Sequence, residues 1–208
     1  MGGSLSVPGC LIAFEGIDGS GKSTQVERLA SALRAGGHEV CVTREPTDGE
    51  HGRKIRALST RGAPLSLEEE LDLFEQDRRE HVKELIAPAL GRGEIVITDR
   101  YFLSTAAYQG SRGLDSDAIL RSHEDLFPLP DVVFFIDVPP EAALLRVEAR
   151  GEEKNESYEK LGFLQDVAKL FRSFERDYIC PIPGEGSPET VHQAVLAQLT
   201  ARPGLPRL

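Results

Sequence analysis

A chain of 208 residues is long enough for one α/β domain with a buried core and too short for two comfortable ones. Apolar residues make up 40% of the chain and charged residues 28%, which excludes a disordered or fibrous protein. The net charge of -10 argues against broad binding to nucleic acid or to an anionic membrane, because both recruit a basic surface. No apolar stretch approaches the ~20 residues that span a bilayer. We therefore expect neither a nucleic-acid nor a membrane partner.

We expect residues 1–10 to form a flexible leader, residues 11–200 a single domain with a lid at about residues 150–160, and residues 201–208 a C-terminal tail. The leader lacks the basic start and long apolar run of a secretory signal. It fits the short Met-Gly-x-x-x-Ser myristoylation pattern, but we interpret it as a leader. The three cysteines form no CxxC pair, which is typical of free thiols in a reducing compartment, so we expect a cytoplasmic protein.

Strand-like and helix-like segments alternate along the chain. Consecutive apolar positions rich in β-branched or aromatic residues predict buried parallel strands over residues 11–15, 39–43, 95–99 and 132–137. Apolar residues at helical spacing predict helices over residues 22–35, 67–90, 142–150, 158–176 and 188–199. We expect Pro88 to bend the second of these helices and Ser187 to cap the last. This alternation predicts a parallel sheet covered by helices on both faces.

Charged side chains end or directly follow these strands. Because ligands of parallel sheets bind outside the carboxyl ends of the strands, we expect these residues to cluster at one edge. They are Glu15, Arg44, Asp99, Arg100 and Asp137. We expect Arg44 to shape a ligand pocket there, either by contacting the ligand or by pairing with a carboxylate.

The segment between the first strand and the first helix carries a phosphate-binding motif. Residues 16–23 read Gly-Ile-Asp-Gly-Ser-Gly-Lys-Ser and match GxxxxGK[ST] in the strand–loop–helix context that the motif requires. Its glycines let backbone N–H groups surround phosphate oxygens, and the helix adds its positive end. Lys22 is placed to reach the β- and γ-phosphates, and the Ser23 hydroxyl to bind Mg²⁺. The expected ATP-binding residues are Gly16, Ile17, Asp18, Gly19, Ser20, Gly21, Lys22, Ser23 and Thr24.

Four motifs together indicate the acceptor. They are residues 14–24, Thr43-Arg-Glu-Pro46, Asp99-Arg-Tyr101 and Ala107-Tyr-Gln-Gly110, and their order and spacing resemble the thymidylate kinase family over about residues 11–199. The resemblance implies a three-layer P-loop NTPase fold with a five-stranded parallel sheet, of which the sequence places four strands. It also implies ATP-dependent phosphorylation of dTMP to dTDP with Mg²⁺ as cofactor. A homodimer formed through helices, residues 67–90 among them, is expected as well.

Two arginines are expected on the acceptor phosphate. Asp99 can hold Mg²⁺ through water, and Arg100 can bind the phosphate while charge builds up between donor and acceptor. The resemblance implies that Arg56 is the second arginine, although Arg53 and Lys54 lie close to it in the sequence. Two planar guanidinium groups suit a dianionic phosphate because each can bind a pair of oxygens.

Phe74 and Arg78 lie four residues apart and therefore share one face of the helix expected at residues 67–90. The resemblance implies that Phe74 stacks on the pyrimidine ring and that Arg78 hydrogen-bonds a base carbonyl, while Arg79 faces elsewhere. Phe74 also fits an apolar core position. An arginine one turn later is harder to explain as core.

The resemblance assigns further contacts to the short helical stretch after Arg100. The Ser104–Thr105 region and Gln109 would contact the base, and Tyr108 would crowd the sugar 2′ position and favour deoxyribose. Asp18 would accept from the 3′-hydroxyl, although an exposed aspartate without a ligand role explains that position as well. The set expected on dTMP is Asp18, Arg56, Phe74, Arg78, Arg100, Ser104, Thr105, Tyr108 and Gln109.

The expected lid departs from the family pattern. Relatives without an arginine in the phosphate loop carry one in an Asp/Glu-Arg-Phe/Tyr-Glu lid motif, but this chain reads Glu-Ser-Tyr-Glu, with Ser157 in place of the arginine. Arg150 or Lys154 could supply the charge, and Arg146 is a weaker candidate. Otherwise turnover is slow or lost, because such an arginine contributes about 10³-fold or more in related enzymes. The expected catalytic residues are Lys22, Asp99, Arg100 and Arg150.

Two other functions remain open from the sequence. One is a kinase for another pyrimidine nucleotide or for a deoxynucleoside, in which Glu15 would act as the base near a 5′-hydroxyl. The other is a nucleotide-binding protein without turnover. Intact acceptor motifs favour an active kinase of dTMP over both.

Overall fold

The computed structural model describes residues 9–61, 65–149 and 157–207, and a parallel sheet forms its centre. The strands lie in the order β2–β3–β1–β4–β5 and all neighbours are parallel. They are β1 (Cys10–Glu15), β2 (Val40–Arg44), β3 (Ile95–Asp99), β4 (Val132–Asp137) and β5 (Ile179–Pro183). The five-stranded parallel sheet is confirmed, and each of the four strands placed from the sequence lies within one residue of its expected bounds.

The central strands are apolar at consecutive positions because both of their faces are covered. Strand β1 is buried at every residue, and β4 at every residue except its last. Phe14 and Phe134 lie opposite each other on these two strands, with ring centroids 5.3 Å apart. The core therefore runs through the sheet, and the polar strand ends lie at its carboxyl edge.

Strand β5 was not predicted from the sequence because its residues, Ile-Cys-Pro-Ile-Pro, include two prolines. It lies at the edge of the sheet beside β4. Proline cannot donate to a ladder, but an edge strand has one row of N–H groups that needs no partner strand. Pro181 and Pro183 are both exposed, while Cys180 and Ile182, which precede them in turn, are buried. Alternating burial, and not a continuous apolar run, marks this strand.

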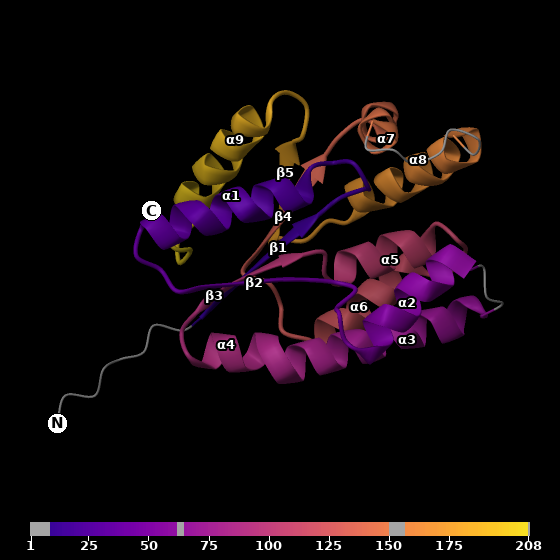
Figure 1. Cartoon of the computed structure of the whole chain (residues 1–208), viewed down its shortest axis with the longest axis horizontal. Coiled ribbons are helices and arrows are strands. Elements are labelled where there is room, and N and C mark those ends of the chain that lie inside the picture. Colours follow the sequence, from indigo (N-terminus) through magenta and orange to yellow (C-terminus); the bar gives the residue numbers. More distant parts are fainter. Residues whose placement is uncertain (1–8, 62–64, 150–156, 208) are drawn as a thin grey trace.

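Helices cover both faces of the sheet. They are α1 (Lys22–Ala35), α2 (Glu50–Arg61), α3 (Leu67–His81), the π-helix η1 (Val82–Ile86), α4 (Ala87–Gly91), α5 (Phe102–Gly110), α6 (Ser116–Leu126), α7 (Pro140–Glu148), α8 (Ser157–Ser173) and α9 (Pro188–Ala201). Figure 1 shows α1 and α9 on one side of the strands and the α3–α4 helix, with α2, α5 and α6, on the other. This arrangement confirms the expected three-layer α/β fold.

The first and last expected helices are confirmed. Helix α1 has the expected bounds, and the Ser187 hydroxyl caps α9 by accepting from the Thr190 N–H at 3.1 Å. Helices α2 and α6 were not expected. Helix α6 nevertheless has an N-cap, because the Asp115 carboxylate accepts from the N–H groups of Asp117 and Ala118.

The long helix expected at residues 67–90 is interrupted before Pro88. Helix α3 ends at His81, the π-helical turn η1 follows, and α4 contains the proline near its start. Pro88 has no N–H for the Glu84 carbonyl, and its ring crowds that oxygen, so the backbone widens over one turn. The irregularity expected at Pro88 thus takes the form of a wider turn in front of the proline.

All three cysteines are free, and Cys10 and Cys180 are buried, as expected for unpaired thiols. Among the residues that the structure describes, no helix is both long enough and apolar enough to cross a membrane.

Candidate active site

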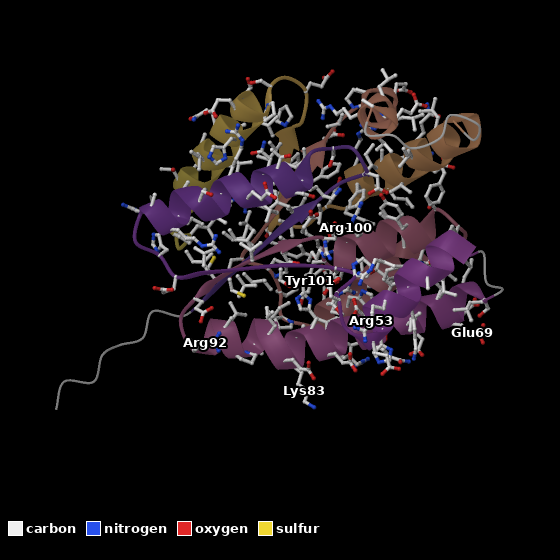
Figure 2. The ribbon with its side chains drawn as sticks, viewed as in Figure 1. Arg53, Glu69, Lys83, Arg92, Arg100 and Tyr101 are labelled. Atoms are coloured by element: carbon white, nitrogen blue, oxygen red, sulfur yellow. The ribbon has the colours of Figure 1, made fainter. Side chains whose placement is uncertain are left out.

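The charged residues at the strand ends lie at the carboxyl edge of the sheet, as expected. Arg44 on β2 is in register with Asp99 on β3, which in turn lies beside the end of β1. Two of these charged residues form ion pairs with nearby residues: Arg44 pairs with Asp48, and Asp137 pairs with Arg172. Figure 2 shows Arg100 and Tyr101 in the interior, near the ends of the strands.

The phosphate loop lies between β1 and α1 and curls around the side chain of Lys22. Gly16 has a φ of 142°, and a Cβ at this position would lie 2.7 Å from the Ile136 carbonyl oxygen. Both features favour glycine. Gly21, with a φ of 98°, directly precedes α1. The Lys22 ammonium is buried and donates to the Ile17 carbonyl at 2.9 Å. The loop and the first turn of α1 thus have the form of an anion-binding site.

The surroundings of Lys22 disfavour its positive charge. Burial, and then the Arg100 guanidinium, lower the pKa of Lys22 to about 8. Asp18, Asp99 and Glu15 act in the opposite direction without offsetting this effect. A bound polyphosphate would add negative charge beside Lys22 and stabilise its ammonium group.

Ser23 and Asp99 meet beside the phosphate loop. The Ser23 hydroxyl on the first turn of α1 donates to the Asp99 carboxylate at the end of β3, over 2.5 Å. Hydroxyl and carboxylate oxygens are hard ligands, so this pair fits Mg²⁺. No group of three or more His, Cys, Asp or Glu side chains among the described residues could hold a metal by itself. Further ligands would therefore come from nucleotide phosphates and water.

Beside the loop, a cavity of about 280 Å³ lies among residues of α2, α3, α5 and α8. We call it the acceptor cavity. Every residue expected on dTMP lines it: Asp18, Arg56, Phe74, Arg78, Arg100, Ser104, Thr105, Tyr108 and Gln109. Lining residues that the sequence analysis missed include Ile55, Glu70, Arg112 and Phe163. Of these residues, Arg112 lies near a motif, because it follows the Ala107–Gly110 motif by two residues.

Arg100 joins the phosphate loop to the acceptor cavity. Its backbone has a φ of 72°, a left-handed conformation that residues other than glycine rarely adopt and that often marks functional sites. Its Nη1 donates to the Gly16 carbonyl at 3.2 Å and to the Ser104 hydroxyl at 2.8 Å. Its Nη2 donates to the Asp18 carboxylate at 2.5 Å and to the Tyr108 hydroxyl at 3.3 Å. One guanidinium therefore contacts both the loop and the cavity.

Arg56 lines the same cavity as Arg100. It donates to the Pro46 carbonyl and to the Asp48 carboxylate, each at 2.9 Å. Its neighbours Arg53 and Lys54 have other partners: Arg53 donates to the Asp48 carbonyl, and Lys54 pairs with an acidic residue one turn earlier on α2. Position in the cavity thus distinguishes Arg56 from the two basic residues that the sequence could not separate from it.

Arg78 also lines the cavity and is buried to 1% exposure. Its Nε and Nη2 both donate to Oε2 of Glu45, at 2.9 and 2.6 Å, and Nη2 also donates to the Thr105 hydroxyl at 2.9 Å. Its Nη1 donates to Nδ1 of His123 at 3.2 Å. Burial alone would raise the pKa of Glu45, but Arg78 and His81 hold it below its ordinary value. These partners explain an arginine in the interior.

Phe74 and Gln109 present surface to the cavity. Phe74 is half-buried and lies outside the hydrophobic core. Gln109 is buried, and its side-chain oxygen has no hydrogen-bond partner among the described residues. A buried amide oxygen without a partner is uncommon and indicates a contact that a ligand would complete. Arg79, by contrast, is exposed and pairs with Glu75.

Tyr108 and Asp18 form the wall between the cavity and the phosphate loop. The Tyr108 hydroxyl accepts from the Asp18 N–H at 3.2 Å and donates to the Asp18 carboxylate at 3.3 Å. Its ring meets Phe163 of α8 edge-on, with centroids 5.9 Å apart. Burial raises the pKa of Tyr108 to about 12, so its phenol is neutral. Asp18 is exposed, but it is anchored by Arg100.

The Glu15 carboxylate is held by hydrogen bonds within the protein. Its carboxylate accepts from the N–H groups of Tyr101 and Ser104 and from the Ser104 hydroxyl. Burial raises its pKa, although these hydrogen bonds and Arg100 act in the opposite direction. It does not line the acceptor cavity. This position does not support Glu15 as the base of a nucleoside kinase.

A second, smaller cavity lies on the other side of the phosphate loop. Its walls come from the loop, including Thr24, from α9 and from the chain between β5 and α9. Arg146 of α7 lines it and donates to the carbonyls of Gly19, Ser20 and Gly184 at 3.2–3.4 Å. The sequence analysis named no residue for the nucleoside part of ATP. This cavity is the candidate, and Arg146 joins it to the loop.

Two predicted features lie elsewhere. Arg44 pairs with Asp48 and lines a separate open hollow beside Ser23 and Asp99, so the carboxylate alternative holds for Arg44. Arg150 and Lys154 lie outside the described residues, as does most of the expected lid. Helix α8 begins at Ser157, but the side chains of its first four residues are not described.

A phosphate loop that opens a helix, beside an acceptor cavity at the carboxyl edge of a parallel sheet, defines a P-loop phosphotransferase acting on a small molecule. A family model for thymidylate kinase matches residues 14–195. The chain is 45% identical to the thymidylate kinase of Desulfotalea psychrophila, over 92% of this chain and 95% of that protein. It is 43% identical to the thymidylate kinase of Akkermansia muciniphila, over 93% of both chains, and 42% identical to that of Xanthomonas campestris pv. campestris, over 95% of this chain and 88% of the relative.

The chain therefore belongs to the thymidylate kinase family. Its activity is the ATP-dependent phosphorylation of dTMP to dTDP, as the motifs indicated. The alternative of a deoxynucleoside kinase is not supported.

Proposed function

We propose that ATP and dTMP meet at Arg100. The ATP phosphates lie on residues 16–23, and the adenosine part lies in the smaller cavity beside Arg146. The dTMP lies in the acceptor cavity with its phosphate between Arg56 and Arg100. The observation that carries this arrangement is the double contact of Arg100, whose guanidinium reaches Gly16 and Asp18 of the loop and Ser104 and Tyr108 of the cavity.

Transfer needs positioning and charge neutralisation, not a base. An oxygen of the ionised dTMP phosphate forms a bond to the γ-phosphorus while the bond to the β,γ-bridging oxygen breaks, and ADP leaves with that electron pair. The acceptor oxygen carries no proton to remove. Lys22 and Arg100 stabilise the charge that spreads over the transferred group. Ser23 and Asp99 would hold Mg²⁺, which when bound neutralises phosphate charge.

Thymine selection belongs to the far end of the cavity. Phe74 offers a flat surface for the base, and Gln109 offers an amide group that lacks a complete set of partners. Arg78 donates to the 4-carbonyl of the pyrimidine, because the 2-carbonyl is common to all pyrimidines and would not discriminate. Tyr108 and Asp18 lie where the sugar joins base to phosphate, and crowding by Tyr108 favours deoxyribose.

A comparison of four acceptors tests this arrangement. ADP release is measured with dTMP, dUMP, dCMP and thymidine at equal concentrations. We expect dTMP to be the best substrate, dUMP to follow because it keeps the 4-carbonyl, and dCMP and thymidine to be poor. Activity on thymidine without activity on dTMP would refute the placement of the phosphate between Arg56 and Arg100.

We propose that Arg150 supplies the charge that other family members obtain from the lid arginine, with Lys154 as the alternative. Arg150 follows α7 directly in the chain, and α7 carries Arg146 to the phosphate loop. R150A is expected to lower kcat at least tenfold and K154A to change it little. S157R is expected to change kcat by less than threefold. A large gain from S157R would instead show that the charge is missing from the native enzyme.

We further propose a cytoplasmic homodimer that forms through α2 and α3. The outer groove between these helices is mainly apolar and includes Ala57, Leu58, Leu65 and Leu73. L73R would place a charge in this groove and is expected to convert a dimer into a monomer in light scattering. A monomeric native protein, or a dimeric L73R variant, would contradict the proposed interface.

A further inference from the structure

A continuous chain of polar side chains surrounds Arg78, and only part of it faces the acceptor cavity. Thr43 and His81 lie 2.6 Å apart at one end, and His81 donates to Oε1 of Glu45 over 3.0 Å. Arg78 follows, and then His123 of α6. His123 does not line the cavity and is 1% exposed. His123 therefore acts on the cavity, if at all, through Arg78.

The partners of His123 fix its tautomer. A guanidinium can only donate, so Nδ1 of His123 accepts from Nη1 of Arg78 and cannot carry a proton. The proton therefore lies on Nε2, which donates to the Glu75 carboxylate at 3.2 Å. Burial, and then Arg78 and Arg79, lower the pKa of His123 to about 3. The imidazole is neutral and acts as an acceptor toward Arg78.

The hydrogen bonds to Glu45 leave one motion of Arg78 unrestrained. Nε and Nη2 both donate to the same oxygen, Oε2, so the guanidinium can pivot in its own plane around that atom. The rings of Tyr101 and Phe127 lie 5.2 and 5.4 Å from its central carbon and oppose tilting, but they do not oppose this pivot. Apart from the covalent stem of the side chain, partners in the plane on the other N–H bonds of Nη1 and Nη2 oppose it.

We propose that His123 is a positioning residue for thymine selection, which fixes the guanidinium of Arg78 in its plane. Thr105 restrains Nη2, and His123 restrains Nη1, which has no other partner among the described residues. Of the five N–H bonds of Arg78, four are then used within the described protein, and a single hydrogen on Nη1 remains for the base. This inference rests on the proposed contact between Arg78 and the 4-carbonyl.

Two side-chain substitutions separate positioning from packing. Asparagine places its amide oxygen where His123 has Nδ1, whereas the amide of glutamine reaches the position of Nε2. We therefore expect H123N to keep the bond to Arg78 and H123Q and H123L to lose it. Removal of a hydrogen bond to a buried charged group is expected to lower kcat/KM for dTMP about tenfold, mainly through KM.

The readout is the ratio of kcat/KM for dTMP to that for dCMP, which does not depend on the fraction of active protein in a preparation. It is expected to fall about tenfold in H123Q and H123L and to stay within about threefold in H123N. E75A removes the second anchor of the His123 ring from a partly exposed position, so it tests the same contact without a buried substitution; the ratio should fall about threefold. H192Q, a change to a buried histidine on α9, is the matched control and should leave the ratio unchanged.

The possible outcomes distinguish this inference from the proposed base contact. If the native enzyme discriminates against dCMP but H123N and H123Q behave alike, the positioning role of His123 is overturned. Unchanged ratios in H123L and E75A would overturn it as well. If the native enzyme accepts dCMP as well as dTMP, the proposed role of Arg78 fails first, and that of His123 fails with it.

Discussion

The proposed base end and the proposed phosphate end of the acceptor cavity hold arginines in opposite ways. At the base end, Arg78 and its partner Glu45 expose 1% and 6% of their side chains. At the phosphate end, the partners of Arg56 and Arg100 are aspartates that expose 74% and 61% of theirs. A buried pair resists separation because each charge would remain unpaired in the interior, whereas water readily accepts an exposed carboxylate. The base end is therefore fixed before substrate binds, and the phosphate end can exchange carboxylate for phosphate.

The largest effect is expected from removal of the charge that serves both substrates. R100M should lower kcat by about 10³-fold, because the transferred phosphoryl group loses a cation that is present in the transition state. Single-turnover ADP release with saturating dTMP measures this step. R92M is the matched control, since Arg92 pairs with Glu94 and lies just past the end of α4, away from the cavity (Figure 2). A loss below tenfold in R100M would place the critical charge elsewhere.

The contrast between the buried and the exposed arginine pairs is tested by the stability of two variants. R78M leaves Glu45 and His81 buried without their cation and should lower the free energy of unfolding by about 3 kcal/mol. R56M removes a cation from an exposed aspartate and should leave the free energy of unfolding nearly unchanged. Both should raise KM for dTMP about tenfold or more. Urea denaturation measures the difference, and equal destabilisation of the two variants would erase the distinction between the ends.

A third effect follows from the pKa of Lys22. In the free protein the pKa is about 8, below its ordinary value, and bound phosphates stabilise the charged ammonium and raise it. Binding of ATP at pH 8.5 should therefore take up a proton, and affinity should fall as the pH rises through 8, by up to about tenfold per unit. Calorimetry in two buffers of different ionisation enthalpy detects the uptake. The same titration at pH 6.5 should show none from Lys22.

The lowered pKa of Lys22 also predicts how the stability of the folded protein changes with pH. Because the folded-state pKa of Lys22 lies below the unfolded value, folding disfavours the charged lysine at low pH. That penalty is fully present below pH 8 and is relieved as the pH rises from about 8 toward 10.5, where the unfolded lysine also loses its proton. ATP should therefore stabilise the protein most at pH 7 and below.

The smallest effect is expected from the hydroxyl of Tyr108. Its hydrogen bonds to Asp18 and Arg100 are 3.2–3.3 Å long, and the side chains of Asp18 and Arg100 keep their bond to each other without it. Y108F should therefore change kcat/KM for dTMP by less than about threefold. It keeps the ring beside Phe163, so discrimination against the matching ribonucleotide should survive. Y108A should lose that discrimination, and a loss in Y108F would assign it to the hydroxyl.

Local sequence signals account for most of the fold. The buried strands β1, β3 and β4 have continuous apolar runs, and α1 follows a motif whose glycines mark its start. The edge strand β5 has neither signal, because its prolines face away from the core. Helix α2 has few apolar positions and follows a glycine-bearing turn, so its pattern resembles a loop. Helix α6, which was also missed, does carry a local signal, the Asp115 N-cap.

The acceptor site was predictable through motifs, but its supporting contacts were not. The motif residues converge on one cavity because three of the motifs end or follow neighbouring strands. Glu45 and His123 reach Arg78 from the residue after β2 and from α6, at sequence separations of 33 and 45 residues. No spacing rule connects such positions. The lid arginine remains unassigned by the described residues, since Arg150 lies outside them.

The exposed aspartates at the phosphate end have a consequence for inhibitors. An uncharged thymine-containing compound would leave Asp18 and Asp48 on their arginines and would need to displace neither. It could take its affinity from the rigid base end, where little conformational entropy is lost on binding. Attachment of groups that reach toward Phe163 would then extend contact to α8. Compounds of this design would not need the phosphate that prevents nucleotides from crossing membranes.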